Sequence, residues 1–324
     1  MRFTEFSGEW KEELLDRIAT LSKGIGIPKE QLSEDGDPCI LYGELYTKYK
    51  SEIIKQVESK TDIDGSKLKR SKANDVIIPC SGETAVDIAT ARCVPFDSIL
   101  LGGDLNVISL HKYDGAFMSY QLNGKRKYDI ARVAQGVSVV HLYGEHLKTI
   151  KTYNPTLPEQ QKIAILLSLL DERIATQNKI IDKLQSLIKG IAQNIVSNNK
   201  PNIRLSDCLD CSSSTLQESD VCETGIYPVY GANGIVGYLD NYNTEGEAVY
   251  IIKDGSGVGT VSYATGKCSA TGTLNTLQAK DGYSLQYLYY ILKVFNFEPY
   301  KTGMAIPHIY FKAYGKAKRF SPSY

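Results

Sequence analysis

The chain has 324 residues, of which 42% are hydrophobic and 23% are charged, and its 37 basic side chains equal its 37 acidic ones. This composition is typical of a folded globular protein, and the length suits two domains. The balanced charge excludes the overall basic field of a protein that binds nucleic acid without sequence preference, and no apolar run approaches the ~18 residues of a membrane-spanning helix.

The N-terminal stretch MRFTEFSGEWKEELLDRIA carries acidic residues where a secretion signal requires a basic end followed by an apolar core. We therefore expect the protein to be cytoplasmic. Its seven cysteines are an odd number in a long chain without a secretion signal, which predicts reduced thiols rather than a disulfide framework.

Residues 1–154 predict a mixed α/β domain. Short β-branched or aromatic runs, such as DVIIP and SILL, alternate with Gly, Asn and Asp turns and with helical stretches such as GEWKEELLDRIAT. Two basic clusters lie in this part, KLKRSK at 67–72 and KRKYDIAR at 125–132. Each is as compatible with a solvated face as with a nucleic-acid contact.

The segment 155–200 predicts one long helix. Apolar residues recur in it with strict 4-3 spacing, which is the pattern of a coiled-coil seam, and the single polar seam residue Gln177 is of the kind that fixes register. Pro158 and the later sequence SNNKPN mark its ends, so the helix has about 40 residues and a length of ~60 Å. The seam must pack against a partner. It consists of Ile163, Leu167, Leu170, Ile174, Gln177, Ile181, Leu184, Ile188, Ile191 and Ile195.

Residues 201–324 repeat the first domain. The segment GVSVVHLYGEHLKTIKTYNPTL (136–157) aligns without gaps with GMAIPHIYFKAYGKAKRFSPSY (303–324), which matches His141 with His308 and Pro155 with Pro322. Two weaker matches occur in the same order: DVIIPCSGET with AVYIIKDGSGVGT, and ARCVPFDSILLGGDLNVISL with GKCSATGTLNTLQAK. One mixed α/β module is therefore used twice, with the helix as a spacer.

Two similar modules at a fixed separation suit a ligand that itself repeats, and DNA presents successive major-groove faces about 34–36 Å apart. Candidate contacts are side chains that bind phosphates or base edges. In the first domain these are Lys125, Arg126, Lys127, Arg132, Gln135, Ser138, His141 and Tyr143. In the second domain they are Lys253, Ser256, Thr273, Asn275, Lys301, His308, Tyr310 and Lys312. The stretch GMAIPHIY suits a tight turn, bounded by Gly and Pro, near a DNA groove, and a buried turn with a hydrogen-bonded core histidine is the competing interpretation.

The sequence motifs that could suggest catalysis or metal binding are each incomplete. Gly255, Gly257 and Gly259 follow an apparent strand, but the next residues, TVSYATG, predict a strand and turn instead of the helix that a cofactor loop opens. The Asn- or Asp-Pro-Pro-aromatic motif of amino-methyltransferases is absent from the sequence. The pair CLDC at 208–211 has no second close pair, which favours free thiols over zinc. We expect no catalytic residue, metal or cofactor in this chain.

The helix sequence NPTLPEQQKIAILLSLLDERIATQNKIIDKLQSLIKGI resembles the central conserved helix of the DNA specificity subunit of type I restriction-modification systems. VYGANGIVGYLDNY (229–242) and GMAIPHIYF (303–311) are similar to segments of that family's target recognition domains. The resemblance implies that 1–154 and 201–324 are target recognition domains that each read half of a bipartite site in double-stranded DNA. It also implies that the helix docks methyltransferase (M) subunits and, through them, restriction (R) subunits, which would bind S-adenosylmethionine, ATP and magnesium.

In that family a second conserved helix usually follows the second domain and pairs with the first, yet here the chain ends at Tyr324, which matches Leu157. We expect the apolar seam to pair with a second copy of this chain or with a helix of a partner. Two functions stay open: a specificity subunit that reads DNA, and a truncated or silent copy that occupies the methyltransferase without productive reading.

Overall fold

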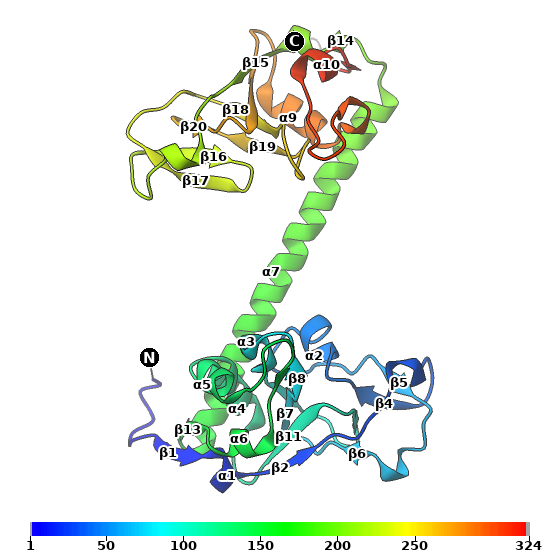
Figure 1. Ribbon diagram of the computed structural model, residues 1–324, viewed down its shortest axis with the longest axis vertical. Helices are drawn as coiled ribbons and strands as arrows, with labels where there is room; N and C mark the ends of the chain where they lie inside the picture. Colours follow the sequence, from blue (N-terminus) through cyan, green and yellow to red (C-terminus); the bar gives the residue numbers. More distant parts are fainter. Residues whose placement is uncertain (1, 322–324) are drawn as a thin grey trace. The chain divides into compact units, whose positions relative to one another are not determined.

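The computed structural model describes residues 2–321 and contains two compact units, whose boundary falls between Gln177 and Asn178, within the long helix α7 (Leu157–Asn198; Figure 1). The predicted mixed α/β class with a long central helix is confirmed. The last part of the predicted repeat, 322–324 with Pro322 and Tyr324, lies outside the described residues. Within 2–321, no helix combines the length and the apolar character that crossing a bilayer demands.

The first unit is built on a four-stranded antiparallel sheet in the order β2-β11-β7-β9. Its strands are β2 (Ala19–Lys23), β7 (Asp75–Pro79), β9 (Arg92–Val94) and β11 (Leu105–Leu110). The apolar strand β7 is buried along its whole length. Helix α4 (Gly115–Asn123) packs against β7 and β9, and the Asp114 carboxylate caps its first turn by accepting from the Phe117 N–H at 2.7 Å.

The second unit is built on a sheet of the same kind, in the order β15-β21-β18-β19. Its strands are β15 (Leu209–Ser213), β18 (Ala248–Ile252), β19 (Val261–Ala264) and β21 (Leu274–Ala279). Helix α9 (Leu285–Lys293), capped by the Ser284 hydroxyl, packs on β18 and β19 as α4 packs on β7 and β9.

The two sheets also share their register. Asn106 in β11 lies opposite Lys23 on one side and Ile78 on the other. Asn275 takes the same place in β21, opposite Ser213 and Ile251. Asn106 aligns with Asn275 in the sequence, so strand pairing supports the predicted internal repeat.

A second sheet in each unit has a shared part and a variable part. The shared part is a parallel strand pair, β4 (Asp37–Ile40) with β10 (Leu100–Leu101) in the first unit and β16 (Tyr227–Gly231) with β20 (Ser269–Ala270) in the second. The first unit adds β3 (Leu32–Ser33), β5 (Lys60–Thr61) and β6 (Lys69–Arg70). The second adds β17 (Gly234–Leu239).

The remaining elements are short. Two-stranded pairs join β1 (Lys11–Leu14) with β13 (Lys151–Asn154), β8 (Ser81–Gly82) with β12 (Val140–His141), and β14 (Ile203–Arg204) with β22 (Lys318–Arg319). The α-helices are α1 (Leu15–Ile18), α2 (Glu44–Thr47), α3 (Ala85–Ile88), α5 (Lys127–Val133), α6 (Gly144–Lys148), α8 (Leu205–Cys208) and α10 (Phe311–Tyr314). The 3₁₀ helices are η1 (Lys29–Gln31), η2 (Gly65–Lys67), η3 (Glu218–Asp220) and η4 (Glu298–Tyr300).

Helix α7 carries a broader apolar face than a two-position seam. Three seam residues at its ends, Ile163, Leu167 and Ile195, are half-buried, whereas the other six apolar seam residues are 41–59% exposed. Leu166, Ile180 and Leu187, each one residue before a seam position, are also exposed. The apolar face therefore has the width typical of a helix that packs on a broad surface.

Candidate nucleic-acid interface

The aligned segments form the same tight turn in both units. In the first turn (135–142), the Gln135 N–H donates to the His141 carbonyl at 2.9 Å and the His141 N–H donates back at 2.6 Å. In the second turn (302–309), Thr302 and His308 exchange the same two bonds at 2.9 and 2.7 Å. Each turn is therefore closed by a pair of backbone hydrogen bonds.

Glycine is required at the second position of each turn. Gly136 and Gly303 have φ values of +117° and +88°, in the left-handed region that other residues rarely adopt. A Cβ atom would lie 2.1 Å from the Val139 carbonyl oxygen in the first turn and 2.4 Å from the Ile306 carbonyl oxygen in the second. The alignment of these two glycines thus has a common steric cause.

Each turn is fixed at its base to a loop that follows the buried central strand. The first loop (80–84) follows β7, and its Cys80 carbonyl accepts from the Leu142 N–H at 2.8 Å. The second loop (253–259) follows β18, and its Lys253 carbonyl accepts from the Ile309 N–H at 2.9 Å. The central sheet therefore presents one turn and one loop together in each unit, and we call these the first and second surfaces.

On the first surface, His141 and Tyr143 form an exposed aromatic pair. Their rings are stacked with centroids 6.1 Å apart, and the Nζ atom of Lys23 lies 5.5 Å from the Tyr143 ring centroid. The side-chain nitrogen of Gln135 lies 3.4 Å from Nε2 of His146. Three of the predicted DNA-binding side chains, those of Gln135, His141 and Tyr143, thus converge here.

On the second surface, the matching histidine has a charged partner. His308 Nδ1 lies 2.8 Å from the Asp254 carboxylate, and because a carboxylate only accepts, this nitrogen carries the proton. The Tyr310 ring lies 6.4 Å from the His308 ring and is 60% exposed. In the first unit, the residue opposite His141 in the strand pairing is Ser81, whereas in the second unit the residue opposite His308 is Asp254. The aligned histidines therefore have a hydroxyl group as neighbour in one unit and a carboxylate in the other.

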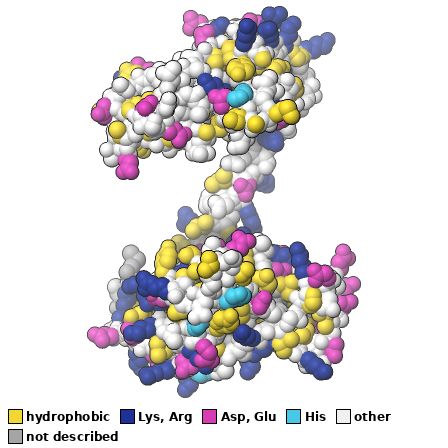
Figure 2. Space-filling model, viewed as in Figure 1, with side chains coloured by type: hydrophobic (Ala, Val, Ile, Leu, Met, Phe, Trp, Pro, Cys, Tyr) yellow, Lys and Arg dark blue, Asp and Glu magenta, His cyan; other side chains and the backbone are white. Residues whose placement is uncertain are grey.

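Apolar side chains occupy the tips of both turns, and none of them was predicted from the sequence. Val137 and Val139 are 96% and 53% exposed in the first turn, and Met304 and Ile306 are 106% and 58% exposed in the second. In each unit, Figure 2 shows a surface histidine next to hydrophobic side chains. The signal in the sequence was the alignment of GVSVV with GMAIP, in which both apolar positions recur.

The predicted basic residues of the first unit lie on and before α5, ahead of the first turn. Arg126 is only 12% exposed, pairs with Asp129 at 2.9 Å and stacks 5.0 Å from the Tyr153 ring centroid. Arg132 is 79% exposed and also pairs with Asp129, at 3.3 Å. Lys125 and Ser138 are exposed and Lys127 is half-buried. Of the four basic side chains, Lys125 and Arg132 are the most accessible to a phosphate.

In the second unit, two predicted residues do not lie at the exposed surface. Asn275 is 4% exposed, donates to the Tyr314 hydroxyl at 3.1 Å and accepts from Ser213 at 3.2 Å, so its side chain braces the interior. Thr273 is half-buried, with its hydroxyl 2.8 Å from that of Thr271.

The other predicted residues of the second unit are accessible to different degrees. Lys301 pairs with Glu298 at 2.6 Å. Ser256 and Lys312 are exposed, and Lys253 is half-buried.

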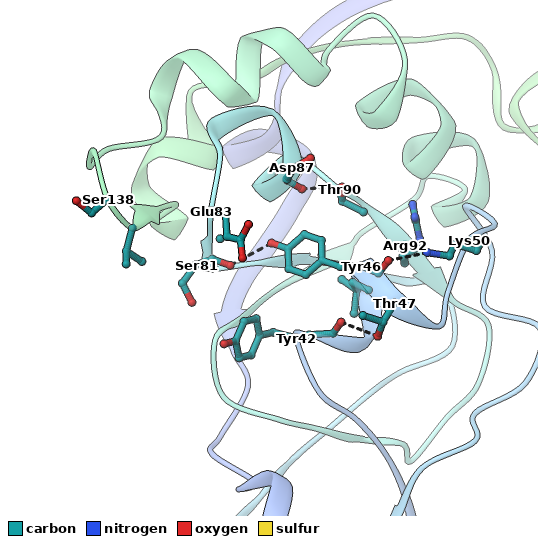
Figure 3. A pocket seen from close by; sticks show the side chains of 14 residues that line it. Tyr42, Tyr46, Thr47, Lys50, Ser81, Glu83, Asp87, Thr90, Arg92 and Ser138 are labelled. Carbon is teal, nitrogen blue, oxygen red and sulfur yellow. Dashed lines mark hydrogen bonds between the residues drawn. The ribbon is translucent and has the colours of Figure 1, made fainter. Parts of the chain in front are cut away.

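A cavity of about 760 Å³ adjoins the first surface (Figure 3). Tyr42 and Tyr46 line it from α2 and its approach, and Ser138 reaches it from the first turn. The Tyr46 hydroxyl donates to the Ser81 carbonyl at 3.0 Å, and burial raises the pKa of this phenol well above its ordinary value. The hollow therefore places the buried Tyr46 phenol beside the turn, in a lining that also contains the charged residues Lys50, Glu83, Asp87 and Arg92.

The Gly-rich and cysteine motifs, which could suggest a cofactor or a metal site, lie in a strand connection and among buried side chains. The segment after Gly259 continues into β19, a strand, and not into a helix. Cys208 is buried and Cys211 is half-buried, and burial raises the pKa of each thiol to about 11. Within 2–321, no three His, Cys, Asp or Glu side chains are grouped so that they could hold a metal ion.

Comparisons with known proteins agree on one family. The family model of the type I restriction modification DNA specificity domain matches residues 8–186 and 201–314. A putative type I restriction enzyme specificity subunit of Haemophilus influenzae is 34% identical over 89 residues, which are 26% of this chain and 23% of that protein. The EcoprrI specificity subunit of Escherichia coli, a type I restriction enzyme subunit, is 29% identical over 101 residues, which are 31% of this chain and 25% of that protein.

The aligned part thus spans about a quarter of the length of each of these curated relatives. Among solved structures, the S subunit of a type I restriction-modification system from M. genitalium is similar, with a TM-score of 0.66 and 20% identity. The similarity covers 91% of this chain and 80% of that one, and it shows a shared fold.

Proposed function

The chain belongs to the type I restriction-modification DNA specificity family, and from this premise we propose that it reads a two-part sequence in double-stranded DNA, one part with each unit. In this proposal it directs methyltransferase subunits, and through them restriction subunits, to that site in the cytoplasm. The chain itself performs no catalysis. S-adenosylmethionine, ATP and magnesium belong to the partner subunits.

The observation that carries the proposal is the pair of matching surfaces. The backbone frame is the same in both, because the turn, its glycine and its bonds to the adjacent loop recur. The side chains on the frame differ, with Asp254 beside one histidine and Ser81 beside the other. A shared frame with different side chains is what two half-sites of unlike sequence require, because base edges are distinguished by side-chain chemistry.

Cations near the surfaces suit the DNA backbone. Lys23 and Arg132 are exposed cations in the first unit, and Lys312 is an exposed cation in the second, where the exposed Ser256 adds a hydroxyl donor. Phosphate contacts of this kind make the affinity fall as the salt concentration rises. We therefore expect specific binding that weakens with added salt.

We further propose that a second helix covers the apolar face of α7, from another copy of this chain or from a partner subunit. The six central seam residues are 41–59% exposed, so covering each would contribute on the order of 1 kcal/mol. Leu184→Lys should weaken this association in sedimentation velocity and in copurification with the methyltransferase. Asp182→Lys introduces a lysine two residues away, off the apolar face, with an even larger change in charge, and should leave the association intact.

The alternative function is that of a silent copy, which occupies the methyltransferase through α7 without productive DNA reading. The exposed apolar face of α7 supports this alternative as much as the first proposal, because binding of a partner through α7 does not require DNA. A salt-sensitive affinity for one DNA sequence separates the two, because a silent copy has none.

The decisive experiment is to coexpress the chain with its own methyltransferase subunit in a host without DNA methylation and to map modified adenines by single-molecule sequencing. A bipartite motif supports the proposal and gives both half-sites. A symmetric motif would mean that two copies each use one unit. If both proteins are soluble and associated but no adenine is modified, the silent copy is favoured.

A further inference from the structure

The two turn tips hold the most exposed large apolar side chains among residues 2–321. Met304 is 106% exposed and Val137 is 96% exposed, whereas the next, Ile226, is 68% exposed. Single exposed apolar residues are common on protein surfaces. Here, however, the two extremes occupy the same position of the same turn in two units, and a second exposed apolar residue follows two positions later in each.

The tips project from a fixed frame. Each turn is closed by two backbone hydrogen bonds of 2.6–2.9 Å and held to the adjacent loop by further ones, of which the Gly255 N–H to Pro307 carbonyl bond is 3.0 Å long. A fixed turn loses little conformational entropy when its tip is buried against a ligand. The apolar side chains are therefore presented as preformed contacts.

Polar groups border the tips on both sides. Gln135 and His141 flank the first tip, and Thr302 and His308 flank the second. The matching ligand is a small apolar group set among hydrogen-bonding groups. In double-stranded DNA, the thymine C5-methyl group has this setting, because it lies in the major groove between the donors and acceptors of neighbouring base edges.

We infer that the apolar tips of the two turns, Val137 with Val139 and Met304 with Ile306, contact thymine methyl groups in the major groove and determine which A·T pairs each unit accepts. This inference rests on the proposed function. Insertion between base pairs would suit Met304 and Ile306, but it does not suit Val137, because valine is not among the side chains that act as apolar wedges; a contact common to both units is therefore favoured.

The tips also differ in a way that could separate two half-sites. The sequence is Val-Ser-Val at 137–139 and Met-Ala-Ile at 304–306. The reach of the leading side chain therefore differs between the units. The central residue offers a hydroxyl in one, Ser138, and only a methyl group in the other, Ala305. In this inference, the backbone of the turn positions the tip, and the side chains of the tip determine which base pair is accepted.

The test replaces thymine by uracil, which removes only the C5-methyl group. The full chain in complex with its methyltransferase is titrated with duplexes that carry the site found by methylation mapping, with one uracil at a time at each thymine. We expect about a fourfold loss of affinity at one or more positions in each half-site, which corresponds to ~0.8 kcal/mol for one buried methyl-sized group.

Two variants assign the effect to the tips. Val137→Ser should abolish the uracil effect in the first half-site only, and Met304→Ser should abolish it in the second only. Both side chains are almost fully exposed, so neither change disturbs the packing of the unit. Ile226→Ser removes an exposed apolar side chain outside the turns and should keep both uracil effects.

Three results would overturn the inference. One is that no uracil position weakens binding. Another is that the tip variants retain the uracil effects of the wild-type complex. The third is that the tip variants weaken association with the methyltransferase while the uracil effects stay unchanged, which would make the tips a protein contact. If the wild-type complex modifies no adenine at all, the proposed function itself fails, and that is known before the uracil series begins.

Discussion

Replacement of Gly303 by Ala tests whether the second turn is the part of that unit that contacts DNA. The residue has a φ value of +88°, and an alanine in the left-handed region is destabilised by about 1–2 kcal/mol. The new Cβ atom would also lie 2.4 Å from the Ile306 carbonyl oxygen and 3.0 Å from Cδ2 of His308. The Ile306 carbonyl belongs to the backbone of the same turn, so the first contact can be relieved only if the turn opens. The second contact is relieved only if the His308 side chain moves.

Gly282→Ala is the matched control in the same unit. Its φ value is +87°, so the conformational strain is the same, but no atom lies within 4 Å of the added Cβ. Gly282→Ala should therefore lose about 1–2 kcal/mol of stability, which lowers the melting temperature by about 2–8 °C, and Gly303→Ala should lose at least as much. Only the Gly303 variant should lose the geometry of the turn.

The assay is the affinity of the complex for its DNA site, compared with a duplex in which the second half-site is scrambled. We expect Gly303→Ala to weaken specific binding about tenfold to a hundredfold, in the range of one or two good base contacts. Gly282→Ala should remain within about twofold of the wild type, because it changes stability alone. Equal affinities for the two variants would refute the assignment of the second turn to DNA.

Three further predictions test other parts of the structure. Leu288→Ala, at a core position that is 1% exposed, should lower the free energy of unfolding by about 2–5 kcal/mol in a denaturant titration, and a loss below about 1 kcal/mol would contradict this packing. Asp254→Ala should weaken binding to the second half-site about fivefold to tenfold, because the His308 ring loses its acceptor; an equal loss at the first half-site would argue against it. Arg2→Ala should lower the melting temperature at pH 7, because it removes the partner of the buried Glu159 carboxylate. The hydrogen bond from Arg2 lowers the pKa of Glu159 below its usual 4.5, so the stabilisation is present above pH 4.5 and is lost as the pH falls further; a difference in melting temperature that persists in acid would contradict this.

Local patterns in the sequence were sufficient for the helix and for the repeat. The 4-3 spacing of Ile and Leu predicts α7 within three residues at either end, because helix formation depends on contacts three and four residues apart. The alignment of 136–157 with 303–324 located the two turns, because their glycines are required by backbone geometry at a single position.

Long-range packing decided the rest of the candidate site. Asn275 was predicted as a DNA contact, but the register of β21 between β15 and β18 points its side chain inward, to Tyr314. Asp254 became the partner of His308, 54 residues away, only because the second loop pairs with the second turn. A one-residue change of register would reverse which side chains face inward, and the sequence of β21, LNTLQA, does not alternate strictly enough between apolar and polar residues to specify that choice locally.

The sequence by itself therefore determined two copies of one module, joined by a helix with an apolar seam, because periodicity and the demands of glycine act over a few residues. Only the tertiary structure decided which of the aligned residues reach the surface. The exposure of Val137 and Met304 and the burial of Asn275 depend on how strands distant in the chain pair and on which face of each sheet the helices cover.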